Sequence, residues 1–280
     1  MLDVRPSPIA GFWYPGDPEA LARSIDSQLS SVEVRAPAGE IVGLIAPHAG
    51  HRYSGRVAAH AFRLVKGRSY DLVAIVSPMH HAMPGQVLTT AHGAYATPLG
   101  AVEVDRQALD LFSESLGASG VAVERVTEDP EHSLEIEIPF LQRSLEGGFR
   151  LLPVMLRDQS RLVAEAVGRG LASVLENRRA LLVASSDLSH FYPDHAARQL
   201  DSEMLARIQA FSPEAVLAGE EQGVAFACGK GAVAAVLWAA DGLGADRVDI
   251  LNYAHSGDVT GDDDSVVGYG AAVIYRAGIP

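Results

Sequence analysis

Residues 41–55 read IVGLIAPHAGHRYSG and set the fold that we expect for the chain. The run 41–46 is continuously apolar, which is typical of a strand buried on both faces of a parallel sheet. Pro47 and the glycines that follow end this run around His48 and keep the loop slim. Helical spacing begins near residue 54. The stretch therefore predicts a buried strand, a loop that points an imidazole into a crevice, and a helix.

The same alternation of β-rich runs and amphipathic stretches continues along the 280 residues. Strands are predicted at 41–46, 71–77, 150–156, 180–186, 248–254 and 266–275. Helices are predicted at 18–29, 54–66, 105–117, 133–145, 159–176, 195–210 and 228–241. No internal repeat or long linker interrupts the pattern. We therefore expect an α/β fold in one domain.

Composition limits the possible partners. The formal net charge is -13, which works against binding the phosphate backbone of a nucleic acid. No apolar run approaches the roughly 20 residues needed to cross a bilayer, and the start lacks a basic end followed by an apolar core. We expect a cytoplasmic protein that uses neither nucleic acid nor membrane. The single cysteine, Cys228, excludes an internal disulfide.

Residues capable of metal binding follow several of the predicted strands. In an open α/β sheet, ligands bind beyond the carboxyl ends of the strands. His48 follows 41–46, and the pair His80 and His81 follows 71–77. Imidazole and thiolate suit iron, copper and zinc, so we predict a metal held by His48, Cys228 and either His80 or His81. A helix beginning at Cys228 would stabilise the thiolate. Alternatively, Cys228 is a small core residue.

Two further pairs of polar residues are candidates for acid–base and binding roles. Asp187 and His190 lie three apart after 180–186, so both could face the crevice, with Asp187 orienting a neighbour and His190 transferring protons. Asp187 could instead cap the segment that follows. Glu131 and His132 precede the predicted helix 133–145, where an anionic substrate group could be anchored. They could equally be the polar start of a packed helix.

The other motifs carry less chemistry. The acidic loop GDVTGDDDS at 257–265 lacks the oxygen spacing of a calcium loop and is expected to be a solvated turn. The sequence has no GxSxG, HExxH or GxxxxGK[ST] motif, which disfavours α/β-hydrolases, zincins and P-loop enzymes. The remaining histidines have weaker claims to function, and they are His51, His60, His92, His195 and His255.

Eight segments together resemble the MEMO family, whose bacterial and archaeal members are called AmmeMemoRadiSam system protein B. They are AGFWYPGD, LIAPHAGHRYSG, SPMHH, TPLG, EHSLEIEIPFL, SSDLSHF, ACGKGAV and GDVTGDDDSVVGYGA, in family order from about residue 5 to residue 275. The resemblance implies a fold similar to the class III extradiol ring-cleaving dioxygenases, the LigB-like group. It implies a single domain over 1–280, with a central mixed, largely parallel sheet flanked by helices.

The resemblance also implies roles for individual residues. The family's metal ligands fall on His48, His80 and Cys228, which selects His80 over His81 and leaves His81 lining the substrate pocket. Asp187 and His190 fall close to the metal. His132, from the EHS motif, falls in the substrate pocket. The genes of bacterial members often neighbour those for a radical-SAM enzyme and an AMMECR-type protein, which are the expected functional associates.

These observations lead to three hypotheses. In the first, the protein is a non-haem iron(II) oxidoreductase of the extradiol-dioxygenase type that acts on a small aromatic or redox-active molecule, with copper or zinc as other possible metals. His190 would be the acid–base group, Asp187 would orient a neighbour, and His132 would help to bind substrate. In the second, the crevice of a former enzyme binds a metal or a peptide without catalysis. In the third, Cys228 is the nucleophile of a metal-free hydrolase.

Overall fold

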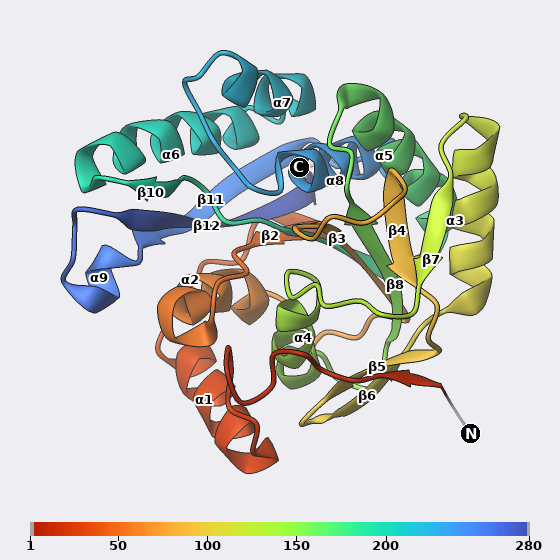
Figure 1. The fold of residues 1–280 in the computed structure, drawn as a ribbon, viewed down its shortest axis with the longest axis horizontal. Coiled ribbons are helices and arrows are strands. Elements are labelled where there is room, and N and C mark those ends of the chain that lie inside the picture. Colours follow the sequence, from red (N-terminus) through yellow and green to blue (C-terminus); the bar gives the residue numbers. More distant parts are fainter. Residues whose placement is uncertain (1–2, 279–280) are drawn as a thin grey trace.

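The computed structural model describes residues 3–278, which form an α/β fold around a nine-stranded sheet (Figure 1). The strands are β1 (Val4–Arg5), β2 (Gly39–Ala46), β3 (Leu72–Pro78), β4 (Val87–Thr90), β5 (Ala94–Thr97), β6 (Gly100–Glu103), β7 (Val123–Val126), β8 (Arg150–Leu156), β9 (Ala180–Ser185), β10 (His190–Tyr192), β11 (Arg247–His255) and β12 (Val266–Ala277). The helices are α1 (Pro18–Ser30), α2 (His51–Arg63), α3 (Arg106–Ala118), the 3₁₀ helix η1 (Glu135–Glu137), α4 (Ile138–Ser144), α5 (Arg161–Leu175), α6 (Asp194–Gln209), α7 (Pro213–Glu221), α8 (Lys230–Gly242) and α9 (Gly257–Thr260).

The centre of the main sheet is parallel. Its strand order is β10-β12-β2-β9-β3-β8-β4-β7, with β11 pairing β12, and the pairs β2–β9, β9–β3 and β3–β8 are all parallel. Strands β10, β11 and β12 join antiparallel on one side, and β4 pairs antiparallel with β8 on the other. The predicted mixed, largely parallel sheet flanked by helices is confirmed.

Helices cover both faces of this sheet. Figure 1 shows α5, α6, α7 and α8 on one side and α1, α2 and α4 on the other, while the small sheet β1-β5-β6 lies beside the end of the chain marked N. Strand β3 is buried along its whole length, as expected when both faces are covered. Helix α8 packs against β9 and β3 with a nearly continuous row of buried alanine and valine side chains.

The apolar runs located the long elements well. All six predicted strands are present as β2, β3, β8, β9, β11 and β12, and the seven predicted helices are present within a few residues. The range 133–145 is divided into η1 and α4. The short strands β1, β4, β5, β6, β7 and β10 and the helices α7 and α9 were not predicted. Within residues 3–278, no helix combines the length and apolar character needed to cross a bilayer.

Candidate metal centre

Three neighbouring strands end at one edge of the sheet and bring candidate ligands together there. Strand β9 lies between β2 and β3, so His48, which follows β2, and His80, which follows β3, flank the end of β9. Cys228 reaches the same edge from the loop before α8. One ligand atom from each of His48, His80 and Cys228 lies within 4.8 Å of the others. The topology therefore places two imidazoles and a thiol around one point.

His48 is held on both ring nitrogens. Its Nδ1 lies 3.0 Å from Ser185 Oγ, and its Nε2 lies 3.1 Å from Cys228 Sγ. The side chain is 1 % exposed, and burial, together with the neighbouring His132 and His80, keeps its pKa well below the ordinary value. His48 is therefore a neutral imidazole, which is the form that binds metals.

Cys228 is fixed by the end of β9. The backbone N–H of Asp187 donates to its Sγ at 3.3 Å, and its own N–H donates to the carbonyl of Asp187 at 3.2 Å. A Cβ on Gly229 would lie 2.6 Å from the carbonyl oxygen of Ser185, so this close approach requires glycine.

Burial sets the protonation state of Cys228 in the absence of an ion. Helix α8 begins at Lys230, after the cysteine, and burial and the nearby Asp187 raise the pKa of the thiol well above its ordinary value. Without an ion, Cys228 is therefore a thiol, and the thiolate that coordination requires stays a prediction. A metal would have to displace the thiol proton.

His80 is oriented by Glu131. The His80 Nδ1 lies 2.9 Å from Glu131 Oε1, and the His80 backbone N–H donates to Glu131 Oε2. The His80 side chain remains 31 % exposed, so its ring can be reached from solvent. Because the Nδ1 side faces the carboxylate, the Nε2 lone pair is free for an ion.

His132 lies beside the three candidate ligands, and Glu131 orients it as well. Its Nδ1 is 3.2 Å from Glu131 Oε1, and its ring stacks on the His80 ring with centroids 5.0 Å apart. The ring of Trp13 covers it, with centroids 4.1 Å apart. Burial lowers the pKa of His132 to about 4, against the raising effect of Glu131. His132 is thus a neutral imidazole between the candidate ligands and an aromatic wall.

Asp187 does not cap a helix, because strand β10 follows it. Its Oδ1 accepts the backbone N–H groups of His48 at 2.8 Å and Ala49 at 3.2 Å, so it fixes the loop that carries His48. Burial raises the pKa of Asp187 to about 7, although these two hydrogen bonds act to lower it. Of the two interpretations from sequence, these contacts fit orientation of a neighbour.

His190 begins β10 and has a free donor or acceptor. Its Nε2 is buried and has no hydrogen-bond partner among the described residues. Its ring lies 5.8 Å from that of Phe226, and burial together with the charge of His80 lowers its pKa. The unsatisfied nitrogen is available to a group that enters the site.

The other histidines lie outside this cluster or at its edge. His51 is buried against Phe140, with ring centroids 4.8 Å apart, and burial lowers its pKa to about 4. His81 is exposed. His60 contacts a carbonyl of its own helix, His92 contacts Asp3, and His195 lies in the first turn of α6.

A second group, formed by Asp194, His255 and Asp263, also has metal-ligand spacing. His255 Nε2 lies 2.7 Å from Asp194 Oδ1, but it also lies 2.6 Å from a guanidinium nitrogen of Arg198. The positive charge that a cation would supply is therefore already provided by Arg198. Asp263 belongs to the acidic loop 257–265, which is exposed apart from Gly257 and contains the short helix α9.

Three residues of the site were not singled out from sequence. Trp13 contacts His132 from the N-terminal loop, and Ser185 and Glu137 form a buried hydrogen bond behind His48. The AGFWYPGD segment was noted only for its resemblance, and a serine at the end of a strand has no distinctive signal. The contact of Glu137 with Ser185 joins residues 48 apart in the sequence, so the local sequence does not reveal it.

The donor set fits a metal ion. Imidazole nitrogen and cysteine sulfur together suit borderline to soft divalent ions such as iron(II), copper and zinc. Both candidate imidazole ligands have Nδ1 held by an oxygen atom, from Ser185 for His48 and from Glu131 for His80. Such outer contacts fix ring orientation in known metal sites. Beside this donor set, the buried Nε2 of His190 has no hydrogen-bond partner among the described residues.

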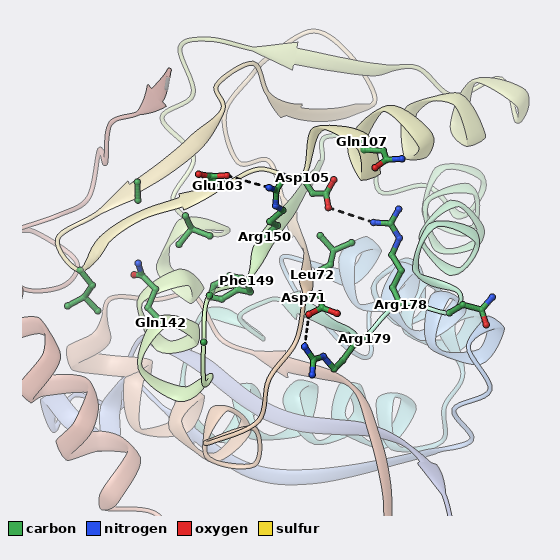
Figure 2. A pocket seen from close by; sticks show the side chains of 16 residues that line it. Asp71, Leu72, Glu103, Asp105, Gln107, Gln142, Phe149, Arg150, Arg178 and Arg179 are labelled. Carbon is green, nitrogen blue, oxygen red and sulfur yellow. Dashed lines mark hydrogen bonds and ion pairs between the residues drawn. The ribbon is translucent and has the colours of Figure 1, made fainter. Parts of the chain in front are cut away.

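A large groove lies at the opposite end of the strands. It has a volume of about 910 Å³ and lies where β3 and β8 begin, among the side chains shown in Figure 2. Its arginines are paired with carboxylates, namely Arg179 with Asp71 at 2.6 Å, Arg178 with Asp105 at 3.7 Å and Arg150 with Glu103 at 3.9 Å. These pairs neutralise its charges, and it contains none of the clustered histidines.

Comparisons with known proteins agree with the motifs. The family model described as Memo-like protein matches residues 5–273. A MEMO1 family protein of Nitrosopumilus maritimus is 34% identical over 273 residues, covering 96% of this chain and 98% of that protein. One from Methanothermobacter thermautotrophicus is 37% identical over 275 residues, covering 95% and 98%. An uncharacterized protein of Escherichia coli K12 is a structural neighbour, with a TM-score of 0.49 and 14% identity over 82% of this chain and 99% of that chain.

Proposed function

The chain belongs to the MEMO family, and we propose that it is a metal-binding protein in which His48, His80 and Cys228 are the ligands of a divalent ion. The observation that carries this proposal is the convergence of their ligand atoms within 4.8 Å from three separate segments of the fold. Two of these segments are loops at the ends of parallel strands, where α/β proteins bind their ligands.

The proposal extends to an iron(II) oxidoreductase of the extradiol-dioxygenase type. When bound there, iron(II) would supply redox chemistry and open positions for substrate and dioxygen. His190, with its unpartnered Nε2, is suited to hold or accept a proton from a substrate hydroxyl. The rings of His132 and Trp13, tilted by 40° with centroids 4.1 Å apart, form an aromatic wall that suits a planar substrate. Asp187 positions the His48 loop.

The test begins with metal analysis of protein purified without oxygen. We expect a near-stoichiometric divalent metal in the wild type and its loss in Cys228→Ser and His48→Ala. The matched control is His92→Ala, because His92 contacts Asp3 outside the cluster. Oxygen consumption by the iron(II) form with a panel of catechols then tests the oxidoreductase step. Retention of the full metal content by both ligand variants would overturn the assignment.

A second candidate function is a non-catalytic scaffold whose crevice binds a peptide or a metal. Exposed aromatic side chains beside the site favour it, since Phe12 is 88% exposed next to Trp13, and Phe191 is 74% exposed next to His190. Exposed apolar patches are typical of interaction sites, and each of these side chains would contribute to one. Tight metal binding without oxygen consumption on any substrate, combined with a loss of peptide binding in Phe191→Ser, would favour the scaffold.

A further inference from the structure

Behind His48, a buried serine hydroxyl contacts three polar groups. Ser185 Oγ lies 2.6 Å from the carbonyl oxygen of Ser133, 2.8 Å from Glu137 Oε1 and 3.0 Å from His48 Nδ1. Ser185 is fully buried, and Glu137 and His48 are each 1% exposed. Water therefore has little access to this cluster, and its hydrogen bonds have to be satisfied among these four residues.

Counting protons shows which group must donate. A serine hydroxyl donates one hydrogen bond and accepts two. The carbonyl of Ser133 can only accept, so the Ser185 proton points to it. The hydroxyl oxygen must then accept from both other neighbours. His48 can donate through an Nδ1–H, and Glu137 can donate only if its carboxyl group is protonated.

The other assignments leave oxygen atoms in repulsive contact. If Glu137 were ionised, its Oε1 and the Ser133 carbonyl would compete for one proton, and the loser would face a lone pair at 2.6 or 2.8 Å. If His48 carried its proton on Nε2, its Nδ1 would be a third acceptor for the same proton. Each unsatisfied buried group costs about 1–3 kcal/mol, and more if it is charged.

We propose that Glu137 is a buried carboxylic acid that acts through Ser185 to hold His48 with its proton on Nδ1 and its Nε2 lone pair directed toward Cys228. Glu137 is thus a positioning residue, since it contacts Ser185 and not the ligand itself. The inference deepens the proposed metal site and takes its functional meaning from it. It means that His48 is already in its metal-binding form before an ion arrives.

The surroundings of Glu137 and of His48 Nε2 agree with a protonated Glu137 and an Nδ1–H tautomer of His48. The Glu137 side chain forms its hydrogen bond with Ser185. Burial and the nearby Asp187 raise the pKa of Glu137 well above its ordinary value, although the hydrogen bond with Ser185 acts to lower it. At the other end, Cys228 Sγ lies 3.1 Å from His48 Nε2, where a thiol proton can be donated to the lone pair.

Spectroscopy of the metal-free wild type tests the assignment directly. In ¹⁵N-histidine NMR, with His48 assigned by its absence in His48→Ala, we expect the Nδ1–H tautomer. In infrared spectra at neutral pH, the difference between wild type and Glu137→Gln should contain the carbonyl stretch of a protonated carboxyl group. A carboxylate band in that difference, or an Nε2–H tautomer of His48, would overturn the inference.

Metal titration of matched variants provides a second test. Glutamine keeps a donor for Ser185, so Glu137→Gln should bind zinc with nearly wild-type affinity. Glu137→Leu removes the donor, and Ser185→Ala removes the hydroxyl that links Glu137 to His48. Each variant should lose about 10- to 100-fold in zinc affinity, as is usual for residues that hydrogen-bond to a metal ligand. Equal losses in Glu137→Gln and Glu137→Leu would refute the need for a donor.

The two proposals fail in distinguishable ways. If the spectra show the acid and the Nδ1–H tautomer but the wild type binds no zinc or iron(II), the proposed metal function fails and the role of Glu137 stands. If the wild type binds metal but Glu137 is a carboxylate, the role of Glu137 fails and the metal function stands. Circular dichroism of every variant checks that it has folded.

Discussion

Replacing Glu131 with glutamine should be among the most damaging single changes to the site. The side chain of Glu131 is buried, and its two oxygens accept the backbone N–H groups of His80, His132 and Ser133 as well as His80 Nδ1. A glutamine offers one oxygen and places an NH₂ group where the second oxygen was. At least one donor then faces another donor in a buried site.

The magnitude follows from the bonds lost. Hydrogen bonds to charged groups contribute about 1.5–3 kcal/mol each, so the loss of one and the weakening of the others should cost roughly 3–5 kcal/mol of unfolding free energy. Metal affinity should also fall about 10- to 100-fold, because His80 and His132 lose their orientation. Glu128→Gln is the matched control, since Glu128 is an exposed neighbour in the same segment.

Urea unfolding of the metal-free proteins measures the first effect and isothermal titration with zinc the second. Burial alone would raise the pKa of Glu131, but the hydrogen bond and charge of His80, the charge of His132 and the Ser133 N–H hold it well below the ordinary value. The stabilisation is therefore complete above the ordinary carboxyl pKa and is lost only in strong acid. A Glu131→Gln protein as stable as Glu128→Gln at pH 7 would refute this reasoning.

Three other changes test separate features. Cys228→Ser should abolish tight zinc binding. In the wild type, zinc displaces the thiol proton, so zinc affinity should rise with pH and the calorimetric heat of binding should depend on the buffer. A heat of binding that is independent of the buffer would contradict this. Gly229→Ala should lose about 1–3 kcal/mol of unfolding free energy, because its methyl group is forced against Ser185. Gly117→Ala, in open space on α3, should gain up to about 1 kcal/mol of unfolding free energy. Equal urea midpoints for the two variants would count against the close approach at Gly229. Arg5→Met should lower the unfolding free energy in urea by about 3–5 kcal/mol, because it leaves the buried carboxylates of Asp129 and Glu135 uncompensated. A loss below about 1 kcal/mol would show that these ion pairs contribute little to stability.

Sequence reasoning succeeded where physical signals are local. Long apolar runs predicted the parallel centre of the sheet, and the carboxyl ends of such strands meet at one edge, so the convergence of His48 and His80 could be anticipated. It failed on β4 to β7, which are only four residues each and depend on neighbouring strands for their stability. It also placed the start of the last helix at residue 228, whereas α8 begins at Lys230, after the cysteine.

Two glutamates of one segment show why the rest of the site could not be predicted. Glu135 and Glu137 are separated by one residue, and both are almost fully buried. Glu135 forms an ion pair with Arg5, which lies 130 residues earlier in the sequence. Glu137 instead contacts Ser185. Identical side chains therefore have opposite electrostatic environments, and the difference arises from tertiary contacts that the local pattern EIE does not encode.

The charges around the proposed centre favour a divalent ion. Glu131 contributes one negative charge, and Cys228 contributes another once its proton is displaced. His48 and His132 are neutral because burial lowers their pKa values. If Glu137 is a neutral acid, and if Asp187, whose pKa burial raises to about 7, is also protonated, a dication brings these charges to zero, whereas a monovalent ion leaves a negative charge and a trivalent ion a positive one. Uncompensated charge is costly in a poorly hydrated site, so the divalent state of a redox-active metal should bind more tightly than its trivalent state.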